Sequence, residues 1–343
     1  MKVLLATSER LSGCIVNCLE GHGHRVVGVV SPFRGVYERQ FTRPRFWAAE
    51  LRGWDILRTC RKKNIEFRIS RVLEEGSVTA FIKSQAPDLL VLFGWPGLVQ
   101  PKTLAFFPKG GMNIHPSLLP RFRGADPLFA LIDSGSDAFG LSFHKATDQL
   151  DEGPIYRAVP LAFSQWDTYD RLYAKVLDGI HAHLPLALTS LDRNPNGAEQ
   201  QGEATYAPRF RHRLRTLDPK QDLAQTMRRT LACYSHHSRL TACGNRLLHF
   251  TKCTPLADRP GDLEDGVIEE TGMFSLTVRL GGRRAKLSGI RFFRKPNWLT
   301  PFLLDLHCRP GRRLRDAQHT WLLYRDAKKS MVGNPILKNG QTK

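Results

Sequence analysis

Short apolar runs alternate with amphipathic stretches through the first half of this 343-residue chain. In order along the chain, the pattern predicts strand, helix, strand, helix, helix and strand at 2–7, 12–21, 25–30, 54–63, 78–85 and 88–95. Uninterrupted Val- and Leu-rich runs of this length are typical of strands that are covered on both faces. The alternation therefore predicts an α/β domain, built on a mostly parallel sheet with helices on both sides.

In a sheet of this kind, ligands bind beyond the carboxyl ends of the strands. We therefore expect any chemistry in the loops after Thr7, Val30, Leu92 and Ile114. The segment after the first strand, 6–13, lacks the glycine spacing that lets a backbone approach a pyrophosphate, and no phosphate-binding P-loop is present. The sequence thus argues against a dinucleotide or nucleoside triphosphate site of either type.

The composition changes after about residue 190. Segment 192–206 is polar and rich in turn-forming residues, as linkers are. Beyond it, a helical pattern at 222–233 precedes closely spaced β-like runs that Gly, Pro and Asp separate, which suggests a small barrel. We therefore predict domains at 1–191 and 207–294, with a linker at 192–206 and a basic C-terminal extension at 295–343.

Composition narrows the class of protein. The chain is 41% hydrophobic, yet it has no apolar run near the roughly 20 residues that a membrane helix needs. Its seven cysteines include no CxxC pair, and two His pairs have i, i+2 spacing, so the sequence offers no metal site and no disulfide framework. We expect a cytoplasmic protein with free thiols, without a metal and without a membrane partner.

A formal charge of +19 favours an anionic partner. Such a charge speeds encounters with polyanions without identifying them. RNA, a nucleotide-linked metabolite and a polyglutamylated cofactor would all suit, and a basic but merely solvated surface is the alternative.

The densest polar cluster lies at 110–128 and 140–156. Asn113 and His115 flank one apolar residue, so on a strand both side chains point to the same face. Asp148 and Asp151 follow in the loop between two predicted strands. A carboxamide, an imidazole and a carboxylate can supply an oxyanion donor, proton transfer and orientation, which are the components of acyl transfer.

Taken singly, these residues have simpler interpretations. Asn113 could be a turn residue, His115 a hydrogen-bonded core histidine and Asp151 the cap of a turn. His144 lies on a predicted strand, and we interpret it as a packing residue. Ser117 has no nucleophile elbow around it, which favours a loop hydrogen bond.

The combined pattern resembles the folate-dependent formyltransferase family, which includes methionyl-tRNA and glycinamide ribonucleotide formyltransferases. The resemblance rests on an Asn-x-His-x-Ser-Leu-Leu-Pro element, an Arg-Gly pair and a Leu-Asp-x-Gly element, and covers roughly residues 1–190. These elements are Asn113, His115, Ser117, Leu118, Leu119 and Pro120, then Arg123 and Gly124, then Leu150, Asp151 and Gly153. The runs at 266–292 look like the small, OB-like barrel that follows the catalytic domain in methionyl-tRNA formyltransferases.

The resemblance implies a Rossmann-like catalytic domain and transfer of a formyl group from 10-formyltetrahydrofolate to an amine. Asn113 would stabilise the oxyanion, His115 would assist proton transfer, and Asp151 would orient His115. The residues expected to contact the folate are Leu92, Phe93, Gly94, Trp95, Ser117, Leu118, Leu119, Pro120, Thr147 and Asp148.

The sequence indicates the acceptor amine less directly than it indicates the reaction. Arginines interleaved with aromatics suit phosphates and bases, and the tRNA enzymes carry a basic insertion near this point. The residues concerned are Arg34, Arg39, Arg43, Arg45 and Trp47, and an ordinary amphipathic surface segment is the alternative interpretation. We predict a methionyl-tRNA formyltransferase-like enzyme. A nucleotide-sugar or amino-acid amine stays open as the acceptor, because His144 stands where sugar and purine enzymes tend to carry His. A formyltetrahydrofolate hydrolase and an inactive RNA-binding relative are the remaining alternatives.

Overall fold

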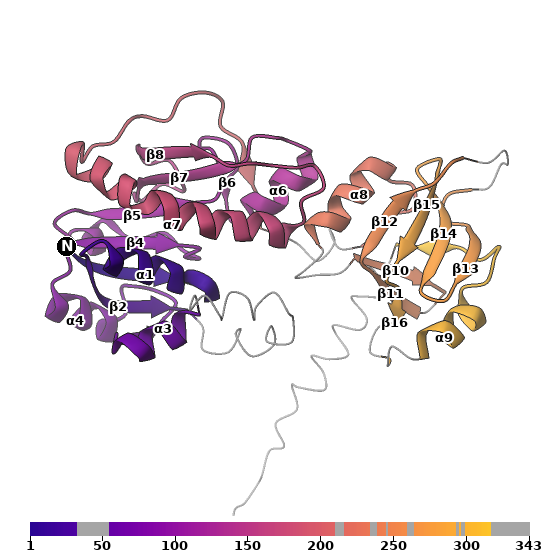
Figure 1. Cartoon of the computed structure of the whole chain (residues 1–343), viewed down its shortest axis with the longest axis horizontal. Helices are drawn as coiled ribbons and strands as arrows, with labels where there is room; N and C mark the ends of the chain where they lie inside the picture. Colours follow the sequence, from indigo (N-terminus) through magenta and orange to yellow (C-terminus); the bar gives the residue numbers. More distant parts are fainter. Residues whose placement is uncertain are drawn as a thin grey trace, which may run out of the picture. The chain divides into compact units, whose positions relative to one another are not determined.

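The computed structural model divides the chain into two compact units, 1–209 and 210–343. The residues that it describes are 1–32, 55–209, 216–233, 239–244, 246–258, 264–292, 295 and 299–316. Each unit has its own sheets and its own buried core (Figure 1).

A seven-stranded sheet forms the centre of the first unit, in the order β3-β2-β1-β4-β5-β7-β8. Its strands are β1 (Lys2–Thr7), β2 (Arg25–Ser31), β3 (Phe67–Ile69), β4 (Leu89–Phe93), β5 (Gly111–His115), β7 (Gly140–Lys145) and β8 (Ile155–Pro160). The first five run parallel, and β7 and β8 are antiparallel to their neighbours. From β1 the chain adds β2 and then β3 on one side, and the connection after β3 returns to place β4 on the other side of β1. The carboxyl ends of β1 and β4 therefore flank a topological switch point.

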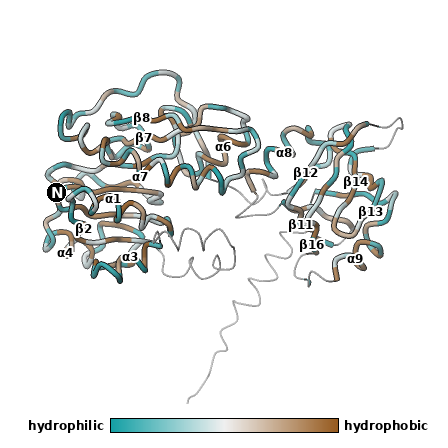
Figure 2. The backbone as a smooth tube through the Cα atoms, in the orientation of Figure 1, coloured by the Kyte–Doolittle hydropathy of each residue, from teal (hydrophilic) through white to brown (hydrophobic). Residues whose placement is uncertain are grey.

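Helices cover both faces of this sheet. They are α1 (Gly13–Gly21), α3 (Ile56–Lys63), α4 (Gly76–Gln85), α5 (Pro101–Leu104), α6 (Pro127–Ser134) and α7 (Tyr169–Arg193), with a 3-10 turn, η1 (Arg10–Ser12). α1 contacts both α3 and α7, whereas α4 packs through Val78, Phe81 and Ile82 on another core cluster. Figure 2 shows hydrophobic residues along the central strands of this unit. The Rossmann-like fold expected from the sequence is confirmed.

The second unit contains two four-stranded antiparallel sheets, β16-β11-β10-β17 and β12-β15-β14-β13. Its elements are α8 (Leu223–Ala232), β10 (Arg239–Cys243), β11 (Arg246–Phe250), β12 (Lys252–Pro255), β13 (Ile268–Gly272), β14 (Ser275–Leu280), β15 (Arg283–Ser288), β16 (Arg291–Phe292), α9 (Thr300–His307) and β17 (Leu314–Arg315). One apolar cluster, which includes Leu248, Val278 and Leu287, joins the two sheets. The predicted barrel-like second domain therefore corresponds to antiparallel sheets around one core.

Two segments differ from the sequence-based organisation. Part of 295–343, predicted as an extension, supplies α9 and β17, and Leu304, Cys308 and Leu314 are buried in the core of the second unit. The predicted linker 192–206 lies within the first unit, and Ala198 pairs with Ile155 at the start of β8. Among the residues that the structure describes, no helix is long and apolar enough to cross a membrane.

Candidate active site

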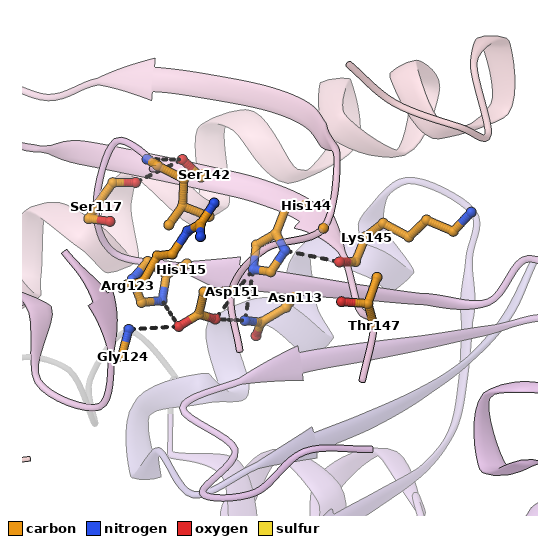
Figure 3. Close-up of polar contacts among 12 residues, drawn as sticks. Asn113, His115, Ser117, Arg123, Gly124, Ser142, His144, Lys145, Thr147 and Asp151 are labelled. Carbon is orange, nitrogen blue, oxygen red and sulfur yellow. Dashed lines mark hydrogen bonds and ion pairs between the residues drawn. The ribbon is translucent and has the colours of Figure 1, made fainter. Parts of the chain in front are cut away.

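β5 and β7 bring three polar side chains together on one face of the sheet. Asn113 and His115 point from the same face of β5, as their i, i+2 spacing predicts. In the antiparallel register between the strands, Asn113 lies opposite His144 and His115 lies opposite Ser142. His144 is thus a direct cross-strand neighbour of Asn113. The interpretation of His144 as a packing residue was wrong in this respect, because its ring takes part in the polar cluster (Figure 3).

Asp151 joins this cluster from the loop between β7 and β8. Its Oδ1 accepts a hydrogen bond from Asn113 Nδ2 at 3.0 Å, and its Oδ2 accepts one from the backbone N–H of Gly124 at 2.8 Å (Figure 3). The side chain is buried, and the backbone is left-handed, with a φ of 54°. A non-glycine residue in this conformation has a conformational cost, so its surroundings must hold it there.

The hydrogen-bond partners fix the tautomer of His115. Nε2 lies 2.8 Å from the carbonyl oxygen of Phe122, which can only accept, so Nε2 carries a hydrogen. Nδ1 faces Asp151 Oδ2 at 3.6 Å. Nδ1 is therefore the ring atom that can gain or lose a proton, beside a carboxylate that stabilises the charged form.

His144 has the opposite tautomer. Its Nδ1 lies 3.0 Å from the carbonyl oxygen of Lys145 and must donate to it. Its Nε2 lies 3.0 Å from Asn113 Nδ2 and accepts from it. Asn113 Nδ2 thus donates one hydrogen to His144 and the other to Asp151. This pairing also fixes the orientation of the amide, because the reverse orientation would place its oxygen against the carboxylate.

Burial and charge act in opposite directions on the two ionisable partners. Burial lowers the pKa of His115, and the Asp151 charge and the Phe122 carbonyl only partly oppose it. Burial would raise the pKa of Asp151, but His144, His115 and the Gly124 N–H together lower it to about 2. At neutral pH the site therefore holds an ionised Asp151 beside a His115 whose neutral form is favoured.

Close backbone approaches fix the two loops that meet at the site. A Cβ on Gly153 would lie 1.9 Å from the carbonyl oxygen of Lys145, and one on Gly124 would lie 2.4 Å from that of Ala207. Only glycine allows the loops to pack at these distances. This explains in physical terms why the Arg-Gly and Leu-Asp-x-Gly elements contain their glycines.

The residues expected to contact a folate lie on three segments around the cluster. Leu92 and Phe93 are buried at the carboxyl end of β4, and Gly94 and Trp95 follow them. Ser117 Oγ donates to the Arg121 carbonyl at 2.6 Å, as expected of a loop hydrogen bond. The other members are Leu118, Leu119, Pro120, Thr147 and Asp148, with a cis peptide bond between Leu119 and Pro120. Contact with a folate stays a prediction for all of them.

Sequence reasoning missed Gln200, whose side chain contacts the backbone of the loop that contains Asp151. A turn-rich segment carries no local signal for such a contact. The five residues of the predicted basic loop, Arg34, Arg39, Arg43, Arg45 and Trp47, lie outside the described residues. Within the described part of the chain, no group of three or more His, Cys, Asp or Glu side chains could hold a metal ion.

A mostly parallel sheet that carries an amide and two imidazoles, next to a loop that adds an ionised carboxylate, is the arrangement expected of a Rossmann-like group-transfer enzyme. The family model of formyl transferases matches residues 2–188. The chain therefore belongs to the formyl transferase family.

Individual relatives agree with this family. Methionyl-tRNA formyltransferase of Thermotoga maritima is 24% identical over 294 residues, which cover 85% of this chain and 91% of that protein. The crystal structure of an N-formyltransferase from Helicobacter canadensis, with folinic acid and dTDP-3-aminofucose, has a TM-score of 0.60 and 13% identity, and covers 85% of this chain and all of that one. HypX from Aquifex aeolicus, crystallised with tetrahydrofolic acid, has a TM-score of 0.59 and 17% identity over 88% of this chain. The chain spans about half of HypX, 47% of its length. At these identities the two structures show a shared fold.

Proposed function

We propose that this enzyme transfers a formyl group from 10-formyltetrahydrofolate to a primary amine, with Asn113, His115 and Asp151 as its catalytic residues. One observation carries the proposal. A single buried carboxylate binds the amide of Asn113 with one oxygen and faces Nδ1 of His115 with the other. This arrangement combines orientation, proton transfer and a nearby donor for negative charge.

The reaction forms a bond between the acceptor nitrogen and the formyl carbon, and breaks the bond from that carbon to the folate nitrogen. The attacking amine must lose a proton, and the leaving nitrogen must gain one. His115 Nδ1 is suited to accept the first proton, because burial favours its neutral form before attack. Asp151 Oδ2 would then stabilise the imidazolium at close range.

Negative charge develops on the formyl oxygen in the tetrahedral intermediate. Asn113 is suited to donate to it, but both hydrogens of its amide already have partners. The oxyanion must therefore take over one of them, and the hydrogen that Asn113 shares with the His144 ring is the one that it can take. Asp151 would keep the other hydrogen, because a bond to a charged acceptor is about twice as strong.

For the acceptor, we propose methionyl-tRNA. The charge of +19 favours a polyanionic partner. The alignment with the Thermotoga maritima methionyl-tRNA enzyme extends over 85% of this chain, so it includes residues of the second unit. A methionyl-tRNA acceptor predicts that the KM for tRNA rises steeply with salt, since each phosphate contact releases counterions.

A nucleotide-sugar amine is the second candidate, and one observation favours it. His144 contacts Asn113 directly. It also stands at the position where the sugar-amine formyltransferases, which this chain resembles, tend to carry His. Such an acceptor presents at most two phosphates, so its KM would change little between low and moderate salt.

One assay tests the reaction and separates the acceptors. The enzyme is incubated with 10-formyltetrahydrofolate alone, with methionyl-tRNA and with a nucleotide-linked amino sugar, and release of tetrahydrofolate is followed. We expect release that depends on methionyl-tRNA. Asn113→Ala should lower kcat by about 10²–10³-fold, the usual effect of losing an oxyanion donor. Asp151→Asn should lower kcat by about 10²–10⁴-fold, because it removes the charge that stabilises the His115 imidazolium during proton transfer.

Asp137→Asn is the matched control, because Asp137 is an exposed aspartate of the same unit outside the site. It should retain the wild-type rate. Near-normal rates in Asn113→Ala or Asp151→Asn would contradict the catalytic assignment. Release of tetrahydrofolate and formate without any acceptor amine would instead identify a hydrolase.

A further inference from the structure

The chain that follows α7 turns back over the first unit and passes β8 (Figure 1). We name residues 198–207 the strap. At one end, Ala198 exchanges two backbone hydrogen bonds with Ile155, at 2.7 and 2.9 Å. At the other end, β9 (Tyr206–Ala207) pairs in parallel with β6 (Arg123–Gly124). The strap therefore connects the strand after the Asp151 loop with the segment that contains Gly124.

Between these ends, Gln200 binds the backbone on both sides of Glu152. Its Nε2 donates to the carbonyl oxygen of Asp151 at 2.8 Å and to that of Gly153 at 2.9 Å. Both hydrogens of the amide are used in this way. One side chain thus holds the turn in which Asp151 has its left-handed conformation.

Arg123 fixes which way the Gln200 amide points. Its Nε and Nη2 both donate to Gln200 Oε1, at 3.2 and 2.8 Å, and its Nη1 donates to Glu152 at 2.9 Å. Because the guanidinium can only donate, the oxygen of the amide must face Arg123 and the nitrogen must face the two carbonyls. The Arg-Gly element and the Leu-Asp-x-Gly element are therefore joined through a glutamine that belongs to neither.

Thr205 acts on the loop that binds His115. Its Oγ1 accepts from the backbone N–H of Phe122 at 2.9 Å, and its carbonyl accepts from that of Arg123 at 2.9 Å. The Phe122 carbonyl is the partner of His115 Nε2, and Phe122 is also left-handed, with a φ of 58°. The strap thus contacts the backbone behind both members of the His115–Asp151 pair.

We infer that the strap is a positioning element for catalysis, and that Gln200 is the positioning residue that holds Asp151 against Asn113 and Gly124. This inference rests on the proposed function for its catalytic consequence only. Gln200 lies behind the carboxylate and contacts its backbone, so its loss should weaken the chemical step more than substrate binding. A displacement of about 1 Å in a catalytic group can lower a rate by about 10²-fold.

Two substitutions separate the contacts of Gln200. Gln200→Leu removes the whole amide. Gln200→Glu keeps an acceptor for Arg123 but places a second oxygen against the carbonyls of Asp151 and Gly153. Gln201→Leu is the matched control, because Gln201 is the next residue, is exposed, and has the same side chain.

We expect Gln200→Leu and Gln200→Glu to lower kcat by about 10–100-fold, while the KM for the folate donor stays within about twofold of wild type. Gln201→Leu should retain the wild-type kcat. The second readout needs no activity. In protein labelled with ¹⁵N-glycine, exchange of the Gly124 amide hydrogen should become faster in both Gln200 variants, because that amide is held by Asp151 Oδ2.

Wild-type kcat and unchanged Gly124 exchange in the Gln200 variants would overturn the inference, as would an effect confined to KM. If Gln200→Leu fails to fold, Gln200→Glu, which keeps the size and the Arg123 contact, decides the question. If the wild-type enzyme releases no tetrahydrofolate with any acceptor, the proposed function fails. The exchange of Gly124 still tests the positioning role in that case.

Discussion

The two histidines of the site are held as different tautomers by backbone carbonyls. Phe122 accepts from Nε2 of His115, and Lys145 accepts from Nδ1 of His144. A carbonyl cannot donate, so each contact fixes a hydrogen on one nitrogen and leaves the other nitrogen available. As a result, His115 presents a basic nitrogen to Asp151, whereas His144 presents one to Asn113.

The charge of Asp151 should be measurable in the titration of His115. Burial lowers the pKa of His115, and Asp151 and the Phe122 carbonyl raise it again in part, while His144 lowers it further. Asp151→Asn removes the charge that favours the imidazolium, so the pKa of His115 should fall. Titration of ¹³C-labelled imidazoles by NMR measures this shift. The exposed Asp148→Asn is the control in the same loop, and a rise of the His115 pKa in Asp151→Asn would contradict the geometry.

The residues that sequence reasoning found are those whose spacing or motif is local. Asn113 and His115 are two residues apart on one strand, so their common face follows from strand geometry. His144 required the antiparallel register of β5 and β7, which no spacing predicts. Gln200 lies 49 residues beyond Asp151, in a segment whose composition indicates only a linker. Neither contact could be found without the fold.

At the scale of elements, a buried ion pair anchors the start of α3. Asp55 caps the helix by accepting from the N–H of Arg58 at 2.9 Å, and its other oxygen binds Arg10 Nε at 2.7 Å. Both charged side chains are almost fully buried, at 5% and 6% exposure. A second pair, Lys63–Glu20, also contacts α3, but its side chains are 31% and 27% exposed.

Loss of Asp55 should therefore cost far more stability than loss of Glu20. Asp55→Ala removes both the helix cap and one member of a buried ion pair, so we expect the free energy of unfolding to fall by about 3–5 kcal/mol. Glu20→Ala should cost at most about 1 kcal/mol, as exposed pairs do. Asp55→Asn keeps a capping oxygen, so its loss of unfolding free energy should lie between those of Asp55→Ala and Glu20→Ala. Urea unfolding followed by circular dichroism measures all three, and equal losses would refute the contrast.

Several elements of the first unit could be predicted, because β1, β2 and β4 are mostly apolar runs bounded by polar segments. α9 and β17 were missed for a physical reason. β17 has only two residues, and α9 lies in a basic stretch where exposed Phe302 and Leu306 weaken the amphipathic pattern. Tertiary packing of Leu304 and Leu314 in the core of the second unit determines both elements.

At the scale of the whole molecule, both units bury their cysteines. All seven are buried thiols that form no disulfide: Cys14, Cys18, Cys60, Cys233, Cys243, Cys253 and Cys308. Burial raises the pKa of Cys18 to about 11, and those of Cys60 and Cys253 to about 12. Cys243 differs, because its hydrogen bond with Cys308 lowers its pKa.

The native protein should therefore react slowly with thiol reagents. At pH 8, we expect an aromatic disulfide reagent to modify the folded chain over hours and the urea-unfolded chain at once. The unfolded chain should release seven equivalents of the aromatic thiolate of the reagent, one for each cysteine. Asp137→Cys places one thiol at an exposed position and should add a single fast equivalent. Fast modification of two or more thiols in the native wild type would contradict the burial of these cysteines.

The position of the strap has a consequence for how this enzyme could exchange its second unit by recombination. By sequence alone, the end of α7 is the natural breakpoint, since a polar segment follows it. A crossover there would replace Gln200 and Thr205 with residues of another protein. The Asp151 turn would then lose its hydrogen bonds from the Gln200 amide, and Phe122 would lose its bond to Thr205. Breakpoints that preserve the first unit lie after Arg209. The segment that must be inherited as one piece therefore includes the strap as well as the central sheet and its helices.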